Sequence, residues 1–158
     1  MERSAFEIYR AGETTPDISL MIKLVLAVRG FRGQLDERLR RIGQSVSRME
    51  TLGAIMNMPG AKSQSDVARR LRVEGATVTR MIDILSREGL VERTPDPGDR
   101  RVNLLSITPS GEMVLEEIFT VYDSLRGHVL AGLGAGDQEE LHRLLDLILT
   151  AVDSPSDQ

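Results

Sequence analysis

The stretch that decides the fold runs from Lys62 to Arg101 and reads KSQSDVARRLRVEGATVTRMIDILSREGLVERTPDPGDRR. Near its start, Ser63 and Asp66 have the spacing of a capping box, in which a hydroxyl and a carboxylate satisfy free backbone N–H groups at the beginning of a helix. Further along, four apolar residues recur at i, i+3, i+4 and i+7 and predict the buried face of a second helix: Val78, Met81, Ile82 and Leu85. We therefore expect one helix that opens at Ser63 and another over residues 76–88, separated by a turn at 72–75.

A hairpin is expected to follow the second helix. Gly89 suits the left-handed position that closes a helix, and the segments 90–93 and 102–107 are rich in β-forming residues. The connection between them, residues 94–101, holds two prolines, a glycine and four charged residues, which predicts an exposed tip. Two short helices followed by a charged hairpin predict a winged helix-turn-helix.

The exposed side of the second helix has the residue types that a DNA groove requires. Opposite its buried face, a helical wheel places small or polar residues: Ala76, Arg80, Asp83 and Arg87, flanked by Thr77 and Thr79. The alternative is a solvated helix face without a binding role. Residues 62–101 contain no aromatic side chain on which unpaired bases could stack, so the pattern favours duplex DNA over RNA.

Charge and cysteine content narrow the class of protein. The chain of 158 residues has a net charge of −4, yet residues 62–101 carry nine basic and seven acidic side chains, a net charge of +2. Such an asymmetry is typical of a nucleic-acid-binding head on an acidic body. The absence of cysteine excludes a disulfide and a thiol sensor. Neither an apolar run long enough for a membrane nor a signal peptide is recognisable, so we expect a cytoplasmic protein.

Amphipathic segments on both sides of the head predict four further helices. They cover about 17–43, 47–58 and 109–129, with Thr108 as the N-cap of the third, and a last helix opened by a capping box at 137–140. Residues 1–14 fit either an arm or a short helix. The predicted fold class is mainly α with a small β-hairpin wing.

The wide apolar faces lie at both ends of the chain. We interpret residues 17–43 and 109–152 as a helical dimerisation lobe and residues 47–107 as the DNA-binding lobe of a single domain over residues 1–158. The alternative is a monomer in which these helices cap the same core.

Several linked motifs resemble the MarR family of bacterial winged helix-turn-helix transcriptional regulators. They are TVTRMID at 77–83, GLVER at 89–93, DPGDRR at 96–101 and ITPSG at 107–111. The resemblance implies a homodimer whose two winged heads read a pseudo-palindromic double-stranded DNA operator. It also implies a repressor that a small aromatic or lipophilic effector releases. By position in that family, Arg100 reaches into the minor groove and Arg101 pairs with Asp99, although the residues alone permit the reverse assignment.

These arguments predict DNA contacts at nine residues: Ser63, Gln64, Ala76, Thr77, Thr79, Arg80, Asp99, Arg100 and Arg101. The methionines at 49, 56, 58 and 81 permit two interpretations: an adaptable ligand pocket between the DNA-binding lobe and the dimerisation lobe, or ordinary filling of the core. The sequence does not identify the effector.

No catalytic, cofactor or metal site is expected. The two histidines, His128 and His142, are interpreted as solvated surface residues. The acidic pairs at 116–117 and 139–140 lack a nucleophile or a partnered histidine, so we predict that the protein is not an enzyme. The alternative function is a winged-helix module for protein or RNA contact without operator binding.

Overall fold

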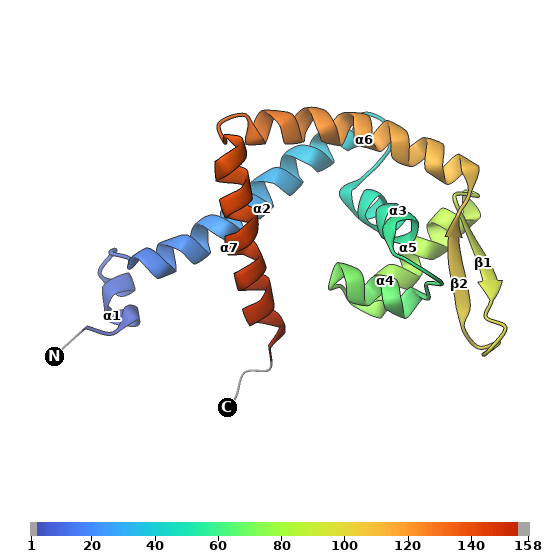
Figure 1. Ribbon diagram of the computed structural model, residues 1–158, viewed down its shortest axis with the longest axis horizontal. Helices are drawn as coiled ribbons and strands as arrows, with labels where there is room; N and C mark the ends of the chain where they lie inside the picture. The colour runs from blue at the N-terminus through green and yellow to red at the C-terminus, as the bar shows by residue number, and fades with distance from the viewer. Residues whose placement is uncertain (1–2, 155–158) are drawn as a thin grey trace. The chain divides into compact units, whose positions relative to one another are not determined.

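The computed structural model describes residues 3–154, which divide into two compact units, with the boundary in the sequence between Tyr122 and Asp123. Seven helices and one antiparallel hairpin follow one another in this part of the chain (Figure 1). Their bounds are α1 (Ala5–Arg10), α2 (Pro16–Arg40), α3 (Val46–Asn57), α4 (Gln64–Leu71), α5 (Gly75–Arg87), β1 (Val91–Pro95), β2 (Asn103–Ile107), α6 (Pro109–Leu130) and α7 (Ala135–Asp153). The predicted class, mainly α with a small hairpin, is confirmed.

The winged helix-turn-helix lies within the first unit. Helices α3, α4 and α5 pack against one another, and the hairpin contacts all three. Their core consists of side chains with almost no exposed surface: Leu52, Ile55, Val67, Val78, Ile82 and Leu85. Burying each of these apolar side chains contributes about 1.5–3 kcal/mol to folding. The predicted inner face of α5 is confirmed, although Met81 at its edge is only half-buried.

The helix boundaries follow from the capping residues in the sequence. At the start of α4, the Ser63 hydroxyl accepts from the Asp66 N–H at 3.2 Å, and the Asp66 carboxylate accepts from the Ser63 N–H at 2.8 Å. At the end of α5, Gly89 has a φ of +73°. The Leu90 N–H donates to the Leu85 carbonyl at 2.9 Å and thereby completes a Schellman motif. Both predicted helix ends are confirmed.

The wing is a two-stranded hairpin anchored to the helix-turn-helix. In its register Val91 lies opposite Ile107 and Pro95 opposite Asn103. The β2 strand also contacts the beginning of α4, because the Leu105 N–H donates to the Lys62 carbonyl at 2.8 Å. This bond fixes the wing beside the start of α4. The first strand runs two residues beyond the predicted 90–93 and ends at a proline, which has no N–H to continue the ladder.

The outer helices agree with the predicted ranges except at two termini. Helix α2 ends at Arg40, before the predicted end at residue 43. Residues 5–10, left open between an arm and a helix, form α1. The capping box predicted at 137–140 is wrong in register, because α7 already begins at Ala135. Asp137 is the third residue of the helix, where its carboxylate accepts from the Gly134 N–H at 2.9 Å. The three glycines before it allowed two starts, and the sequence does not distinguish them.

The second unit contains the end of α6 and all of α7. Two ion pairs, Asp123 with Arg126 and Glu140 with Arg143, join neighbouring turns of these helices. None of the residues of α7 is buried in the single chain. Within residues 3–154, no helix combines the length and the apolar character that a membrane span requires.

Candidate nucleic-acid interface

The predicted groove-reading face of α5 is exposed. The residues Ala76, Thr77, Thr79 and Arg80 all lie at the surface, while Val78 and Ile82 are buried beneath them. Within the described part of the chain, no hydrogen bond or ion pair holds the Arg80 guanidinium, so it is available to a ligand. The 3.6-residue period of the helix causes this division, since the apolar residues occupy the opposite side.

The beginning of α5 offers backbone donors. Glu74 is the N-cap residue by its extended backbone, but its side chain makes no capping hydrogen bond. The first N–H groups of a helix lack partners within the helix, and the helix dipole makes them favourable for a phosphate. The Glu74 side chain therefore does not cap these N–H groups.

A polar network ties the two helices of the motif to the wing. The Gln64 amide Nε2 of α4 donates to the Thr79 hydroxyl of α5 at 3.0 Å. The Gln64 Oε1 accepts from Nη2 of Arg93 at 3.2 Å, and the same nitrogen pairs with the carboxylate of Asp83. Arg93 was absent from the predicted site. No sequence pattern indicates its role, because its hydrogen bond to Gln64 spans 29 residues.

The tip of the wing is shaped by two aspartates. The Asp96 carboxylate accepts from the Gly98 N–H at 2.9 Å, and the Asp99 carboxylate accepts from the Arg101 N–H at 3.0 Å. The expected contact between Asp99 and Arg101 thus exists, but through the backbone rather than the guanidinium. A short Asp side chain readily bonds the backbone N–H two residues ahead, whereas pairing with a guanidinium would require a long, flexible side chain to be held in one position. Among residues 3–154, neither Arg100 nor Arg101 has a side-chain partner, and both are exposed.

Two groups of predicted residues meet in one polar hollow. A surface depression of about 220 Å³ is lined by Ser63, Gln64, Ser65, Arg101, Val102 and Asn103. It brings the start of α4 next to the base of the wing tip. Of the nine predicted contact residues, three therefore share this hollow, and four lie on α5 beside it in the chain's first unit.

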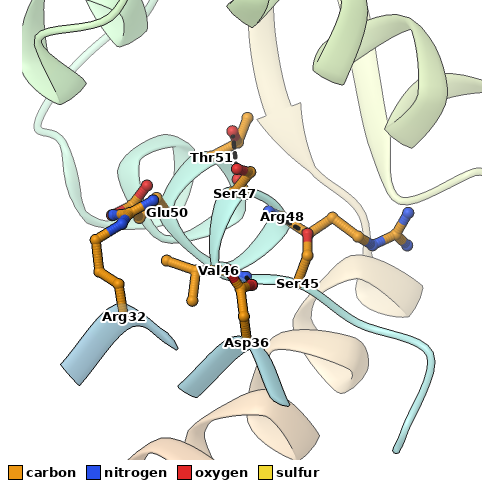
Figure 2. Close-up of polar contacts among 8 residues, drawn as sticks. All are labelled: Arg32, Asp36, Ser45, Val46, Ser47, Arg48, Glu50 and Thr51. Carbon is orange, nitrogen blue, oxygen red and sulfur yellow. Dashed lines mark hydrogen bonds and ion pairs between the residues drawn. The ribbon is translucent and has the colours of Figure 1, made fainter. Parts of the chain in front are cut away.

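Helix α3 supports α5 from behind and is itself held by α2. Figure 2 shows the Asp36 carboxylate of α2 at the start of α3, where it accepts from the Val46 N–H at 2.8 Å. Arg32 of α2 forms an ion pair with Glu50 of α3. On the other side, Arg48 of α3 donates to the Glu88 carboxylate at the end of α5. These contacts connect the long helix α2 to the recognition helix through α3.

A cavity of about 280 Å³ lies between α3 and α5. Its walls are mainly apolar, from Leu71, Val73, Val78, Met81 and Ile84, with polar groups from Ser47, Glu50, Thr51, Thr77 and Arg80. Met81 is the one methionine of the predicted pocket that lines it, while Met56 lines a separate hollow beside Leu115 and Phe119. Thr77 and Arg80 belong both to this cavity and to the exposed face of α5.

Metal ligands do not cluster in the described residues. Residues 3–154 hold no group of three or more His, Cys, Asp or Glu side chains that could bind a metal ion. His128 and His142 are both exposed on helix surfaces.

Comparison with known proteins agrees with this geometry. Residues 42–102 match the model of the MarR family. The structure is similar to the transcriptional regulator BldR from Sulfolobus solfataricus, with 29% identity and a TM-score of 0.77 over 85% of this chain and 95% of that one. It is also similar to a mutant MarR from E. coli complexed with operator DNA, with 25% identity and a TM-score of 0.74 over 84% and 94% of the two chains. The MepR–DNA complex from S. aureus, at 19% identity and a TM-score of 0.76 over 88% and 100% of the two chains, shares the fold.

Proposed function

This chain belongs to the MarR family of transcriptional regulators, and we propose that it binds a pseudo-palindromic DNA operator as a homodimer and represses transcription until a small ligand releases it. The observation that carries the proposal is the exposed face of α5 beside the unpaired arginines of the wing. A winged helix that reads duplex DNA places its second helix in the major groove and leaves the wing to reach the neighbouring minor groove. We infer that such a regulator acts in the cytoplasm, in the compartment of the DNA that it binds.

The charges of the head support phosphate binding. Several acidic side chains of residues 62–101 are already engaged by arginines, namely Asp66 by Arg69, Asp83 by Arg93 and Glu88 by Arg48. Arg80, Arg100 and Arg101 have no such partner within the described part of the chain. These three cations lie on α5 and at the wing tip, where a duplex would contact them.

The apolar residues outside the head support a dimer. The first half of α2 exposes Leu20, Met21, Val25, Leu26 and Val28, and α7 exposes Leu141, Leu144, Leu147, Leu149 and Val152. Monomeric proteins rarely leave so many apolar side chains in water. We assign residues 17–43 and 109–152 to a dimerisation lobe in which a second copy of the chain covers these surfaces, and residues 47–107 to the DNA-binding lobe. Two heads roughly 34 Å apart could then read two half-sites on one face of the duplex.

Release by a ligand is supported by the cavity between α3 and α5. Its volume of about 280 Å³ suits a small aromatic molecule, and Arg80 is among the residues that line its mainly apolar wall. A small aromatic or lipophilic carboxylate could pair with Arg80 there and withdraw it from DNA. The ligand would lower DNA affinity only as far as it prefers the protein without DNA.

The test is binding of the full-length protein to duplex DNA from the region upstream of its own gene, by fluorescence anisotropy at several salt concentrations. We expect tight binding that weakens with salt, a stoichiometry of one dimer per site, and release by aromatic carboxylates. A duplex of the same composition in scrambled order is the control. Equal affinity for the two duplexes would contradict operator recognition and favour a winged-helix module for protein or RNA contact.

A further inference from the structure

We propose that Gln64 and Thr79 contact the operator as one coupled unit that presents two hydrogen-bond donors, and that Arg93 is the residue that positions this unit. The proposal rests on the proposed function, because it names what part of a DNA base edge the helix-turn-helix selects. Three side-chain groups carry it: the Gln64 amide, the Thr79 hydroxyl and the Arg93 guanidinium.

The orientation of the Gln64 amide is determined by Arg93. A guanidinium can only donate hydrogen bonds, so the amide group facing it must be the acceptor, Oε1, which lies 3.2 Å from Nη2. The NH₂ group of Gln64 then faces Thr79, and Nε2 donates to the hydroxyl oxygen at 3.0 Å. A rotated amide would place two donors against each other at Arg93.

This orientation leaves two hydrogen atoms that can be donated to a ligand. The Thr79 hydroxyl already accepts from Gln64, so its own proton is free to donate, and within residues 3–154 it has no acceptor. The Gln64 NH₂ group carries two hydrogens and uses one of them on Thr79. Since Thr79 is exposed on the groove-reading face of α5, the pair offers two donors there.

Arg93 is held too firmly to be a phosphate contact. Its side chain is 29% exposed, its Nε is buried without a partner, and its charge is paired with Asp83. Asp83 stands four residues after Thr79, one turn further along α5. Arg93 therefore connects Gln64 of α4 to the same face of α5 that carries Thr79, and it fixes the separation of the two helices at the point where they would meet a base.

The chemistry that matches two donors is an edge with two acceptors. In the major groove guanine presents O6 and N7, both acceptors, whereas adenine presents one acceptor and one donor and cytosine presents a donor. The structure thus assigns a guanine preference to one base pair in each half-site. Gly75 and Ala76, which precede Thr79 on α5, have no polar side chain that could contribute to this selection.

The experiment begins with selection of duplexes from a random library by the full-length wild-type protein. The best duplex is then bound by wild type, Gln64→Ala, Thr79→Val and the double variant, with every base pair of the half-site changed in turn. We expect one guanine position at which each single variant loses about tenfold in discrimination, and at which the double variant loses no more than about tenfold. A loss of about a hundredfold in the double variant, the product of the single effects, would overturn the coupled unit.

A change that replaces the amide by a carboxylate separates donor from acceptor. In Gln64→Glu the carboxylate accepts from both Arg93 and the Thr79 hydroxyl, which consumes the free proton and leaves only acceptors for DNA. We expect the guanine preference to be lost or replaced by a preference for cytosine at that position, measured as the ratio of affinities for the two duplexes. An unchanged ratio would overturn the donor assignment.

The role of Arg93 is tested with Arg93→Met, a side chain of similar length without charge or donors. A positioning residue predicts loss of the guanine discrimination, an unchanged salt slope, and no further loss when Gln64 is already Ala. If Arg93 instead bound phosphate, affinity would fall equally for all sequences and the slope would decrease by about 2 per dimer, which would overturn the assignment. Arg143→Met on α7, which also removes a paired arginine, is the matched control.

Two outcomes separate this inference from the proposed function. If the wild type selects no sequence from the library, operator recognition and the coupled unit both fail. If it selects a sequence but the effects of Gln64→Ala and Thr79→Val multiply, the coupled unit alone fails. The side chains of Gln64 and Thr79 lie at or near the surface, so we expect their variants to fold. The test therefore stays valid even if Arg93→Met unfolds.

Discussion

The guanidinium of Arg48, on α3, donates to both oxygens of the Glu88 carboxylate at the end of the recognition helix. The side chain of Arg48 is 14% exposed, and its Nε also donates to Gln44 at 2.7 Å. The contact therefore attaches the last turn of α5 to the helix that supports it. Because Gly89 follows at once and ends the helix, this pair stands where α5 would otherwise fray.

The hydrogen bonds from Arg48 lower the pKa of Glu88 below its ordinary value of 4.5. A carboxyl group whose pKa is lower in the folded than in the unfolded protein stabilises the fold above the unfolded pKa, and the effect is lost as pH falls through the folded pKa. We therefore predict that Glu88→Gln costs about 0.5–1 kcal/mol at pH 7, the range of a solvent-screened pair. Urea unfolding at pH 7 and below pH 4 measures it. A difference between variant and wild type that stays constant with pH would contradict the pairing.

The packing at Gly111 predicts a larger effect on stability. A Cβ at this position would lie 2.2 Å from the Leu90 carbonyl oxygen and 2.7 Å from a side-chain carbon of Ile107. Since the first of these is backbone, Gly111→Ala should lower the free energy of unfolding by about 1–3 kcal/mol. Gly53→Ala in α3 is the control, because no atom lies within 4 Å of its added Cβ. It should gain about 1 kcal/mol of helix propensity. Equal thermal stability of the two variants would disprove the close approach.

Two neighbouring wing residues of opposite charge are both predicted to strengthen operator binding. Arg100→Ala should weaken operator binding and reduce the salt slope by about 2 per dimer, since one cation is removed from each half-site. Asp99→Ala removes a negative charge, yet it should also weaken binding, because the Asp99 carboxylate holds the Arg101 N–H and shapes the tip. Anisotropy titrations at several salt concentrations measure both. Glu117→Ala, which removes an exposed acid on α6, controls for charge, and tighter binding by Asp99→Ala would refute the role of the turn.

The exposed leucines of α7 predict the site of dimer contact. Leu147 is 58% exposed in the single chain, so Leu147→Glu should leave the protomer folded while it places a charge in the proposed interface. We expect a monomer, or a dimer weakened at least tenfold, by light scattering over a dilution series. His142→Glu introduces the same charge at an exposed polar position of α7 and should remain dimeric. A Leu147→Glu protein that keeps the wild-type mass at every dilution would exclude this surface.

Local signals account for what the sequence predicted well. The capping box at Ser63, the helix end at Gly89 and the i, i+3, i+4, i+7 pattern of α5 each depend on residues within one or two turns of one another. Their chemistry is complete in the sequence. For the same reason the helix start before Asp137 was misplaced, because three nearby glycines permit more than one local solution.

Contacts between distant residues account for what was missed. The Arg93 pairing with Gln64, the close approach of Gly111 to Leu90 and the Arg48 pair with Glu88 join segments 21–40 residues apart. No periodicity or spacing indicates them, since each depends on how two elements are packed. The Asp99 contact shows a smaller error of the same kind: the partner was correct, but the backbone N–H was closer than the guanidinium.

The most direct test of operator recognition is the ratio of two dissociation constants. The full-length protein is titrated, at roughly physiological salt, with the duplex that it selects from a random library and with a scrambled duplex of the same composition. The account predicts a ratio of about 10³ or more in favour of the selected duplex, as is typical of sequence-specific DNA-binding proteins. A ratio near one, with both affinities equally dependent on salt, would contradict it.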